Sequence, residues 1–174
     1  MNKKYEFVPG DEKVIAPGRT VKRIRSLVAI AIFDVPSGSL GGYIESEANL
    51  SVYGNAWVSG NAWVSGDARV YGDAQVYGDA RVPGDARVYG DAWVYGNGLI
   101  FWASRVGTAN GTLTVFNGKD GLIVTRGCFI GSVDEFLAKS EREHDDATHL
   151  EYRLLIEVAH SRISRAIAKA GGAA

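Results

Sequence analysis

The chain has 174 residues, with 19 Lys and Arg against 20 Asp and Glu, so its formal net charge at pH 7 is −1. This length allows one domain of ordinary size or one repeat array with small ends. The balanced charge excludes an overall electrostatic field that attracts nucleic acid or an anionic membrane. The single cysteine excludes an internal disulfide, and no apolar segment follows the charged N-terminal residues, so we expect a cytoplasmic protein.

Residues 1–43 are predicted to form an N-terminal β cap. The segment from Thr20 to Ser51 alternates between polar and apolar residues, then runs apolar, and then contains Gly and Ser. This order predicts one or two strands followed by a loop. Its longest apolar run, Leu27–Phe33, is too short to span a bilayer and is predicted to be a buried strand. The simplest role for the region is to cover the open end of the repeat that follows.

Residues 44–111 are predicted to form a solenoid because a period of six residues runs through them. Valine occupies every sixth position from Val52 to Val94, and glycine follows two positions later, from Gly54 to Gly96. Neither a helix nor a regularly alternating strand has this period, whereas a short strand followed by a turn does. Each hexad is therefore predicted to be one side of a coil, with valine inside and glycine at the corner.

The coil is predicted to extend beyond the strict repeat at both ends. Ile100 and Val106 continue the valine column, which carries the coil to about Gly111. Ile44 and Leu50 fall in the phase of the alanine column and are expected to form a looser first coil.

Three outer faces follow from this geometry, because with three hexads per turn residues 18 apart stack roughly 4.8 Å from one another. The first face carries Tyr53, Arg69, Tyr71, Arg87, Tyr89 and Arg105. The second face carries the aromatic residues Trp57, Tyr77, Trp93 and Tyr95, with Ser59 and Gln75 beside them. The third face is mixed and carries Trp63, Ser65, Arg81, Pro83, Leu99 and Phe101.

The first face is the candidate ligand-binding surface. Guanidinium groups offer a fixed fork of hydrogen-bond donors and tyrosine rings offer a stacking surface, a combination that suits a planar or anionic ligand. The predicted ligand-binding residues are Arg69, Tyr71, Arg87, Tyr89, Arg105 and, from the C-terminal region, Arg126. The alternative is that these arginines only offset the carboxylates at the corners while the tyrosines cover the sheet.

The second face is the candidate oligomer interface. A large exposed apolar patch usually marks an interface, so Trp57, Tyr77, Trp93 and Tyr95 are predicted to contact copies of the same chain. Nucleic-acid binding has less support, because the basic row is short and acidic corners flank it.

Residues 112–174 are predicted to contain strands followed by two helices. The strands are expected at Thr112–Phe116 and Leu122–Ile130. Ser132 with Glu135 three residues later predicts a capping box that starts the first helix, and a second helix is expected over 147–168. The apolar stripe of the second helix contains Leu150, Leu154 and Val158, with Leu155, Ile163 and Ile167 as further candidates. Through this stripe the helix is expected to pack on the body or on copies of itself.

The repeat resembles the hexapeptide-repeat proteins, which fold as a left-handed parallel β-helix of triangular section. The runs "GGYIESEANLS", "GNAWVSGNAWVSGDARVYG" and "SRVGTANGTLTVFNGKDGLIVTRGCFIGSVDEF" resemble a group of phage and prophage proteins. These resemblances imply a mainly β fold in which a left-handed parallel β-helix lies between an N-terminal β cap and a C-terminal strand-plus-helix region. They also imply a homotrimer by analogy and, for a phage-encoded chain, a location in the host cytoplasm.

Enzyme chemistry has less support than binding. The acyltransferases among hexapeptide-repeat proteins generally use a histidine as general base, and the similar γ-type carbonic anhydrases hold zinc with histidines. Here His144, His149 and His160 all follow the coils, so no metal and no cofactor are expected. Cys128 and His144 would support nucleophilic chemistry only if they met, and the alternative for Cys128 is a small buried residue on a strand.

The sequence therefore predicts a non-catalytic binding or interaction protein. Its expected role is to antagonise host defence, by sequestering a nucleotide-type signal or by masking a host protein. Two alternatives stay open, an acyltransferase-like enzyme and a structural or oligomerisation scaffold.

Overall fold

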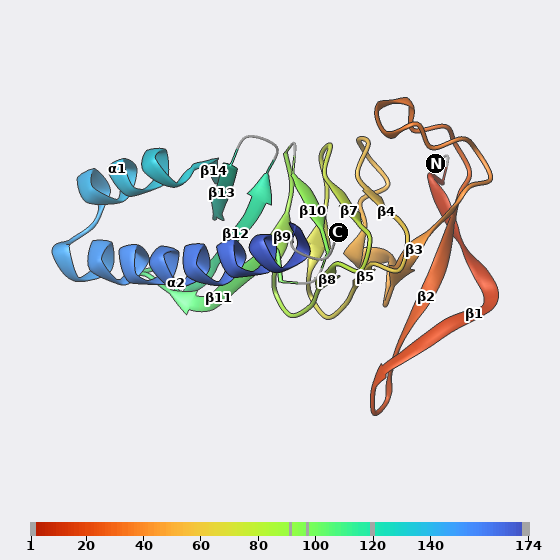
Figure 1. The fold of residues 1–174 in the computed structure, drawn as a ribbon, viewed down its shortest axis with the longest axis horizontal. Coiled ribbons are helices and arrows are strands. Elements are labelled where there is room, and N and C mark those ends of the chain that lie inside the picture. The colour runs from red at the N-terminus through yellow and green to blue at the C-terminus, as the bar shows by residue number, and fades with distance from the viewer. Residues whose placement is uncertain (1–2, 91, 97, 119–120, 172–174) are drawn as a thin grey trace.

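The computed structural model describes residues 3–90, 92–96, 98–118 and 121–171. A protruding hairpin and a loop lie at one end of the molecule, a stack of short strands forms the middle, and a small sheet with two helices lies at the other end (Figure 1). These three regions follow the order of the chain.

The N-terminal region is an antiparallel sheet that joins the stack of short strands. β1 (Tyr5–Ala16) and β2 (Arg19–Ser26) form a hairpin, and β3 (Leu40–Ile44) pairs antiparallel with β2. On its other side β3 pairs parallel with β5 (Trp63–Val64), so the hairpin and the stack share one sheet.

The predicted buried strand over Leu27–Phe33 is wrong. This segment is a loop that contains the 3-10 helix η1 (Ala31–Phe33), and of its apolar residues only Ile30 is buried. Leu27, Val28 and Ile32 are 41%, 39% and 56% exposed. The reason is that Ser26, the last residue of β2, bonds directly to the backbone next to β3, which leaves no free edge there for another strand.

Seven short strands form the coils of the stack. They are β4 (Trp57–Val58), β5, β6 (Arg69–Val70), β7 (Gln75–Tyr77), β8 (Arg81–Val82), β9 (Arg87–Val88) and β10 (Trp93–Tyr95). They pair in three parallel sheets, β4–β7–β10, β5–β8 and β6–β9. Paired residues are one coil apart, as in Val58 with Val76, which is the three-sided coil that the period of six predicts.

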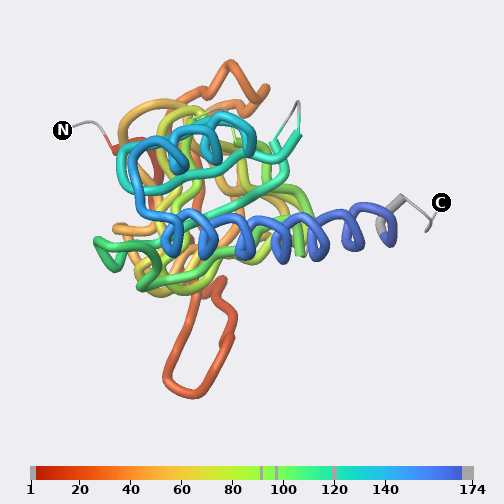
Figure 2. The backbone as a smooth tube through the Cα atoms, turned by 90° about the vertical axis from the view of Figure 1, so that its left-hand side faces the viewer, coloured from red at the N-terminus to blue at the C-terminus, as the bar shows by residue number. Residues whose placement is uncertain are grey.

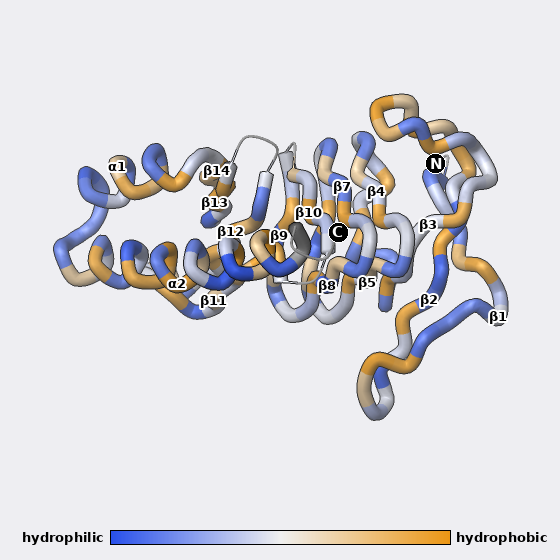
Figure 3. Tube along the Cα trace, in the orientation of Figure 1, coloured by the Kyte–Doolittle hydropathy of each residue, from blue (hydrophilic) through white to orange (hydrophobic). Residues whose placement is uncertain are grey.

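The interior of the coils is the alternating column of valine and alanine that the repeat predicts. Every valine from Val58 to Val94 and every alanine from Ala56 to Ala92 is buried. Hydrophobic and hydrophilic residues alternate along these coils (Figure 3). Each corner glycine has positive φ, and at Gly72 a Cβ atom would lie 3.0 Å from the backbone nitrogen of Gly90, so the close stacking of coils requires glycine there.

The first coil differs from the prediction. Ile44 pairs with Val64 and Leu50 bridges to Val70, so both residues lie in the valine column and not in the alanine column. Leu50 pairs with a residue 20 positions later, whereas from Trp57 onward each residue pairs with the one 18 positions later. The first coil therefore contains two extra residues between Leu50 and Trp57. Val52 is displaced by this insertion and is 41% exposed, although the repeat predicts that it is buried.

The parallel coils also end earlier than predicted. β11 (Ile100–Val106) pairs antiparallel with β12 (Gly111–Gly118), and β13 (Gly121–Arg126) and β14 (Phe129–Ser132) complete a four-stranded antiparallel sheet. The continuation of the coil to residue 111 is therefore wrong. Phe116 from β12 is fully buried against the valine and alanine core, so it closes the end of the coils.

Two threonines join this antiparallel sheet to the last strand of the first face. The backbone nitrogen of Arg87 donates to Oγ1 of Thr114 at 3.2 Å, and Oγ1 of Thr125 donates to the carbonyl of Arg87 at 3.2 Å. Both threonines are buried. Their hydroxyls therefore supply the acceptor and the donor that a further coil would have supplied.

Two helices complete the C-terminal region, α1 (Val133–Glu143) and α2 (Asp146–Gly171). The capping box is confirmed, since the nitrogen of Glu135 donates to Oγ of Ser132 at 3.2 Å and the nitrogen of Ser132 donates to Oε2 of Glu135 at 2.8 Å. None of the helices in the described residues has an apolar stretch long enough to cross a bilayer.

The apolar stripe of α2 is only partly where the sequence predicts it. The side that packs on the antiparallel sheet carries the buried residues Tyr152, Ile156, Ala159 and Ile163, with Leu155 partly buried. Leu150, Leu154 and Val158 are 43%, 51% and 48% exposed. The helix is thus apolar on two sides. The predicted candidates Leu155 and Ile163 pack on the body, whereas Leu150, Leu154 and Val158 do not, and for these three the alternative of packing on copies of the chain stays a prediction.

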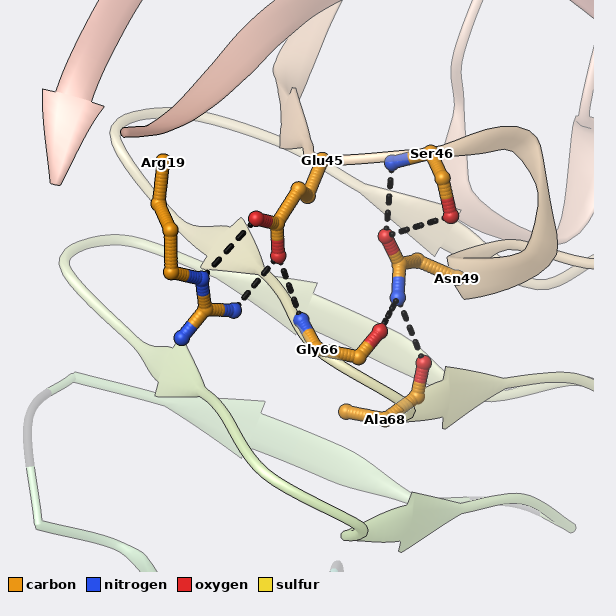
Figure 4. A network of polar contacts seen from close by, with 6 residues as sticks. All are labelled: Arg19, Glu45, Ser46, Asn49, Gly66 and Ala68. Atoms are coloured by element: carbon orange, nitrogen blue, oxygen red, sulfur yellow. Dashed lines mark hydrogen bonds and ion pairs between the residues drawn. The ribbon is translucent and has the colours of Figure 1, made fainter. Parts of the chain in front are cut away.

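A polar network closes the N-terminal end of the coils (Figure 4). The amide nitrogen of the buried Asn49 donates to the carbonyls of Gly66 and Ala68, both at 2.8 Å. Nearby, Glu45 accepts hydrogen bonds from Arg19, at 2.9 and 2.5 Å, and from the backbone nitrogen of Gly66 at 2.6 Å. The hydrogen bonds from Arg19 first, and then that from Gly66, lower the pKa of Glu45 to about 2.

Replacing Glu45 by Gln is expected to lower the free energy of unfolding by about 1 kcal/mol at pH 7, since the hydrogen bonds from Arg19 and Gly66 to this partly exposed side chain lose the charge of their acceptor. Because the folded-state pKa lies below the usual 4.5, this stabilisation is present above pH 4.5 and is lost as the pH falls toward 2. Urea unfolding across this pH range measures it. Glu47→Gln is the control, because its ion pair with Lys3 is exposed and 3.5 Å long. An equal loss in both variants, or a difference that persists at pH 2, would contradict the role of Glu45.

Candidate ligand-binding site

Four residues of the first face form a compact surface, here called the Arg/Tyr ladder: Arg69 and Tyr71 from β6 and its end, and Arg87 and Tyr89 from β9 and its end. Arg69 pairs in register with Arg87. The rings of Tyr71 and Tyr89 stack with their centroids 4.7 Å apart and their planes at 10°. Parallel pairing one coil apart therefore places like side chains above one another, as the repeat predicts.

A hollow of about 290 Å³ lies beside the Arg/Tyr ladder on the side of the first coil. Its lining includes Ala48, Ser51, Arg69, Tyr71 and Arg87. The bridge between Leu50 and Val70 places Ser51 opposite Tyr71. In a regular array a tyrosine would stand at this position, so the hollow is the space that the missing ring leaves.

The two-residue insertion in the first coil explains this hollow. The insertion displaces Tyr53, which is 68% exposed and does not extend the tyrosine stack. The small Ser51 takes its place, so one face of the Tyr71 ring is left open toward the hollow. The sequence predicted Tyr53 on the same face as Tyr71, and that prediction is wrong because the register changes before the regular coils begin.

The charge on the Arg/Tyr ladder is not neutralised within the described residues. Neither Arg69 nor Arg87 forms an ion pair in that part of the chain, and the polar contact of the Arg87 side chain is with the neutral hydroxyl of Tyr71. Like charges directly opposite each other in a sheet destabilise it. An anion that binds between the two guanidinium groups relieves this repulsion, so the surface is electrostatically suited to a negatively charged ligand.

The two tyrosine hydroxyls stay protonated at neutral pH. Burial raises the pKa of Tyr71, while the neighbouring Arg87 and Arg69 oppose the change. Burial, together with Tyr71 and Cys128, raises the pKa of Tyr89 to about 12. Both groups are therefore neutral hydrogen-bond donors, and the positive charge of the surface comes from the arginines alone.

Two predicted ligand-binding residues lie off the Arg/Tyr ladder. Arg126 donates from Nη2 to the carbonyl of Val106 at 2.9 Å, and its guanidinium lies 5.9 Å from the centre of the Tyr152 ring, so it braces the C-terminal region. Arg105 lies in an irregular part of β11 with a φ of 61°. The predicted place of Arg105 in this stack is wrong because the parallel coils end at β10. Arg126, predicted as a ligand-binding residue of the C-terminal region, instead uses its guanidinium within that region.

The turn between β13 and β14, which directly follows Arg126, borders the Arg/Tyr ladder. The hydroxyl of Tyr89 donates to the carbonyl of Phe129 at 2.5 Å. The adjacent Cys128 is exposed, not buried on a strand as the alternative interpretation had it, and it is close enough to Tyr71 and Tyr89 to affect their pKa values. His144 contacts the Tyr152 ring, with a centroid distance of 5.6 Å.

The second face is less extensive than predicted. Trp57 is only 1% exposed, because β3 passes over it so closely that a Cβ atom on Gly41 would lie 2.8 Å from its ring. Trp57 therefore cannot contribute to an oligomer interface. The ring centroids of Tyr77 and Tyr95 lie 5.4 Å apart. Trp93 and Tyr95 are 40% and 46% exposed, so they are the exposed aromatic residues that remain on this face.

Other surfaces carry a weaker case for a ligand. A hollow of about 710 Å³ separates the β1–β2 hairpin from the third face, but its lining mixes Lys13 and Arg81 with Asp79. On the same face Leu99 and Ser65 are buried, although the repeat predicts both outside. In the described part of the chain, no three His, Cys, Asp or Glu side chains gather where they could hold a metal ion.

Comparison with known families agrees with the architecture of the coils. Residues 52–66, 64–77, 74–86 and 80–96 each match the family model described as YdcK Beta solenoid repeat. These matches cover the stretch that forms β4 to β10. Together with the three parallel sheets, they make this chain a mainly β protein of the β-solenoid repeat class. No curated protein matches the sequence.

Replacing Arg69 by Gln is expected to raise the free energy of unfolding by about 0.5 kcal/mol at low salt, because it removes a like-charge pair in register. The gain should disappear in 1 M NaCl, where charges are screened over about 3 Å. Chemical denaturation at the two salt concentrations measures this. The control is Arg81→Gln, since Arg81 pairs with Trp63 and should show no gain. A loss of stability in Arg69→Gln would show that the arginine is compensated in the free protein.

Proposed function

We propose that this chain is a non-catalytic binding protein whose Arg/Tyr ladder holds a nucleotide-type anion. The observation that carries the proposal is the in-register pair Arg69 and Arg87, without ion-pair partners in the described residues, beside a hollow that exposes one face of Tyr71. Guanidinium groups bind phosphate oxygens in pairs of parallel hydrogen bonds. An aromatic ring binds a nucleobase by stacking, whatever the base.

The geometry supports a specific arrangement of such a ligand. Its base stacks on Tyr71 in the hollow and takes the position of the ring that the first coil lacks. Its phosphate groups lie against Arg69 and Arg87, which line the same hollow on the same face of the strand. A rigid surface of this kind loses little conformational entropy on binding, which favours tight sequestration over turnover.

The biological setting is part of the same proposal. We infer a phage or prophage origin from the resemblance of the segments that flank and start the repeat, with action in the host cytoplasm. The role is to antagonise host defence by sequestering a nucleotide-type signal, and masking of a host protein is the other form of this antagonism. The three-sided coils and the period of six support a hexapeptide-type β-helix, and the resemblance to hexapeptide-repeat proteins implies that it is left-handed.

A structural or oligomerisation scaffold is the second candidate function. The observation that favours it is the exposed apolar side of α2, with Leu150, Leu154 and Val158. The expectation of a trimer rests on analogy with hexapeptide-repeat proteins, and the burial of Trp57 removes one of the four residues that supported it.

Thermal unfolding against nucleotides, cyclic dinucleotides, NAD derivatives and acyl-CoAs tests the binding proposal. A ligand at one hundred times its Kd stabilises the folded state by about 2.7 kcal/mol. We expect a nucleotide-type compound to raise the unfolding temperature in this way. In the Arg69→Gln/Arg87→Gln double variant its affinity, measured by calorimetry, should fall at least tenfold. Arg81→Gln should bind like the parent protein.

A second variant separates the hollow from the charge. Ser51→Tyr is expected to fill the hollow and extend the tyrosine stack, so that binding is lost while the arginines remain. Binding that survives both variants would contradict the proposed site. A shift with acyl-CoA alone would instead support the acyltransferase-like alternative.

A further inference from the structure

One side of α2 is apolar along its first half and basic along its second half, and this side points away from the molecule. Leu150, Leu154 and Val158 follow one another at intervals of four residues, so they lie on one face of the helix. The buried residues Tyr152, Ile156 and Ile163 lie on the opposite face. The exposed leucines and valine are therefore not the edge of the core but a separate apolar stripe.

The stripe is accessible, since Leu150, Leu154 and Val158 are 43%, 51% and 48% exposed. Figure 2 shows that the C-terminal part of α2 continues past the rest of the molecule. A shallow hollow of about 440 Å³ runs along this face, lined by Leu154, Val158 and Ser161, by the acidic Glu157 and by the basic Arg162 and Arg165. Exposed apolar residues in such an arrangement mark an interaction surface.

The charges along the same stretch of chain decide which partner fits. Asp145 and Asp146 stand at the start of α2, whereas Glu143 at the end of α1 is already paired with Lys139 at 2.5 Å. The second half of α2 carries Arg162 and Arg165, which form no ion pair within the described residues. A second α2 in the antiparallel direction would place the basic half of each helix against the acidic end of the other. A parallel arrangement would place arginine against arginine, which is unfavourable.

We propose that the outer face of α2 is the interface of an antiparallel dimer of this chain. The two-fold axis passes near Leu154, so that Leu150 of one copy faces Val158 of the other and the two Leu154 side chains meet at the centre. Such an isologous contact is the common form of a homodimer. This proposal does not depend on a ligand at the Arg/Tyr ladder, which lies on the coils.

Sedimentation velocity of the full chain tests the interface. We expect the parent protein to be a dimer and Leu154→Glu to raise the dimer Kd at least tenfold. Because the ends of the paired helices carry opposite charges, the dimer should also weaken as NaCl rises from 0.05 to 0.5 M. Val14→Glu is the matched control, since Val14 is 77% exposed on the β1–β2 hairpin and should leave the dimer unchanged. Circular dichroism of Leu154→Glu should match the parent, as Leu154 packs on nothing in the described monomer core.

Disulfide cross-linking tests the direction of the helices. In a Cys128→Ser background, Leu150→Cys and Val158→Cys proteins are mixed and oxidised. The antiparallel dimer predicts that the mixed 150–158 disulfide forms at least five times faster than either same-residue disulfide. A monomer at all concentrations, a trimer unaffected by Leu154→Glu, or faster same-residue cross-links would each overturn the proposal.

Discussion

The parallel hydrogen bonds between successive coils are the constraint on which the rest of the structure depends. The nitrogen of Arg69 donates to the carbonyl of Ala86 at 2.9 Å, and that of Tyr71 donates to Val88 at 3.0 Å. This pairing fixes which side chains lie above one another, so a repeated sequence becomes rows of identical groups. It stacks Tyr71 on Tyr89, and it also holds Arg69 beside Arg87 despite their like charges.

The same constraint leaves unpaired backbone groups at both ends of the coils, and the chain satisfies them with side chains. Asn49 donates to two carbonyls at the N-terminal end, and Thr114 and Thr125 pair with Arg87 at the other end. Because these caps lie on the first face or next to it, they also delimit the Arg/Tyr ladder. The proposed site is thus the part of the face between the two caps.

The sequence predicted the regular part of the fold well, because a strict period determines the register wherever it holds. The buried valines and alanines, the stacking of Tyr71 on Tyr89 and the capping box at Ser132 follow from local patterns. The sequence could not show the two extra residues of the first coil, because Val52 and Gly54 keep the six-residue spacing of the repeat. Only the pairing of Leu50 with Val70 shows that the register differs before them. The end of the coils, the burial of Trp57 and the contact of the β13–β14 turn with Tyr89 depend on distant segments folding back.

The Arg/Tyr ladder is expected to attract anions, and the reaction rate of the native Cys128 beside it measures this directly. The alkylation rate of Cys128 is determined with anionic iodoacetate and with neutral iodoacetamide, and the ratio of the two rates cancels any change in thiol ionisation. In the Arg69→Gln/Arg87→Gln double variant, we expect the iodoacetate-to-iodoacetamide rate ratio to fall by about twofold or more at low salt. A ratio that stays the same would mean that the two arginines create no positive potential at this surface, and would contradict the account.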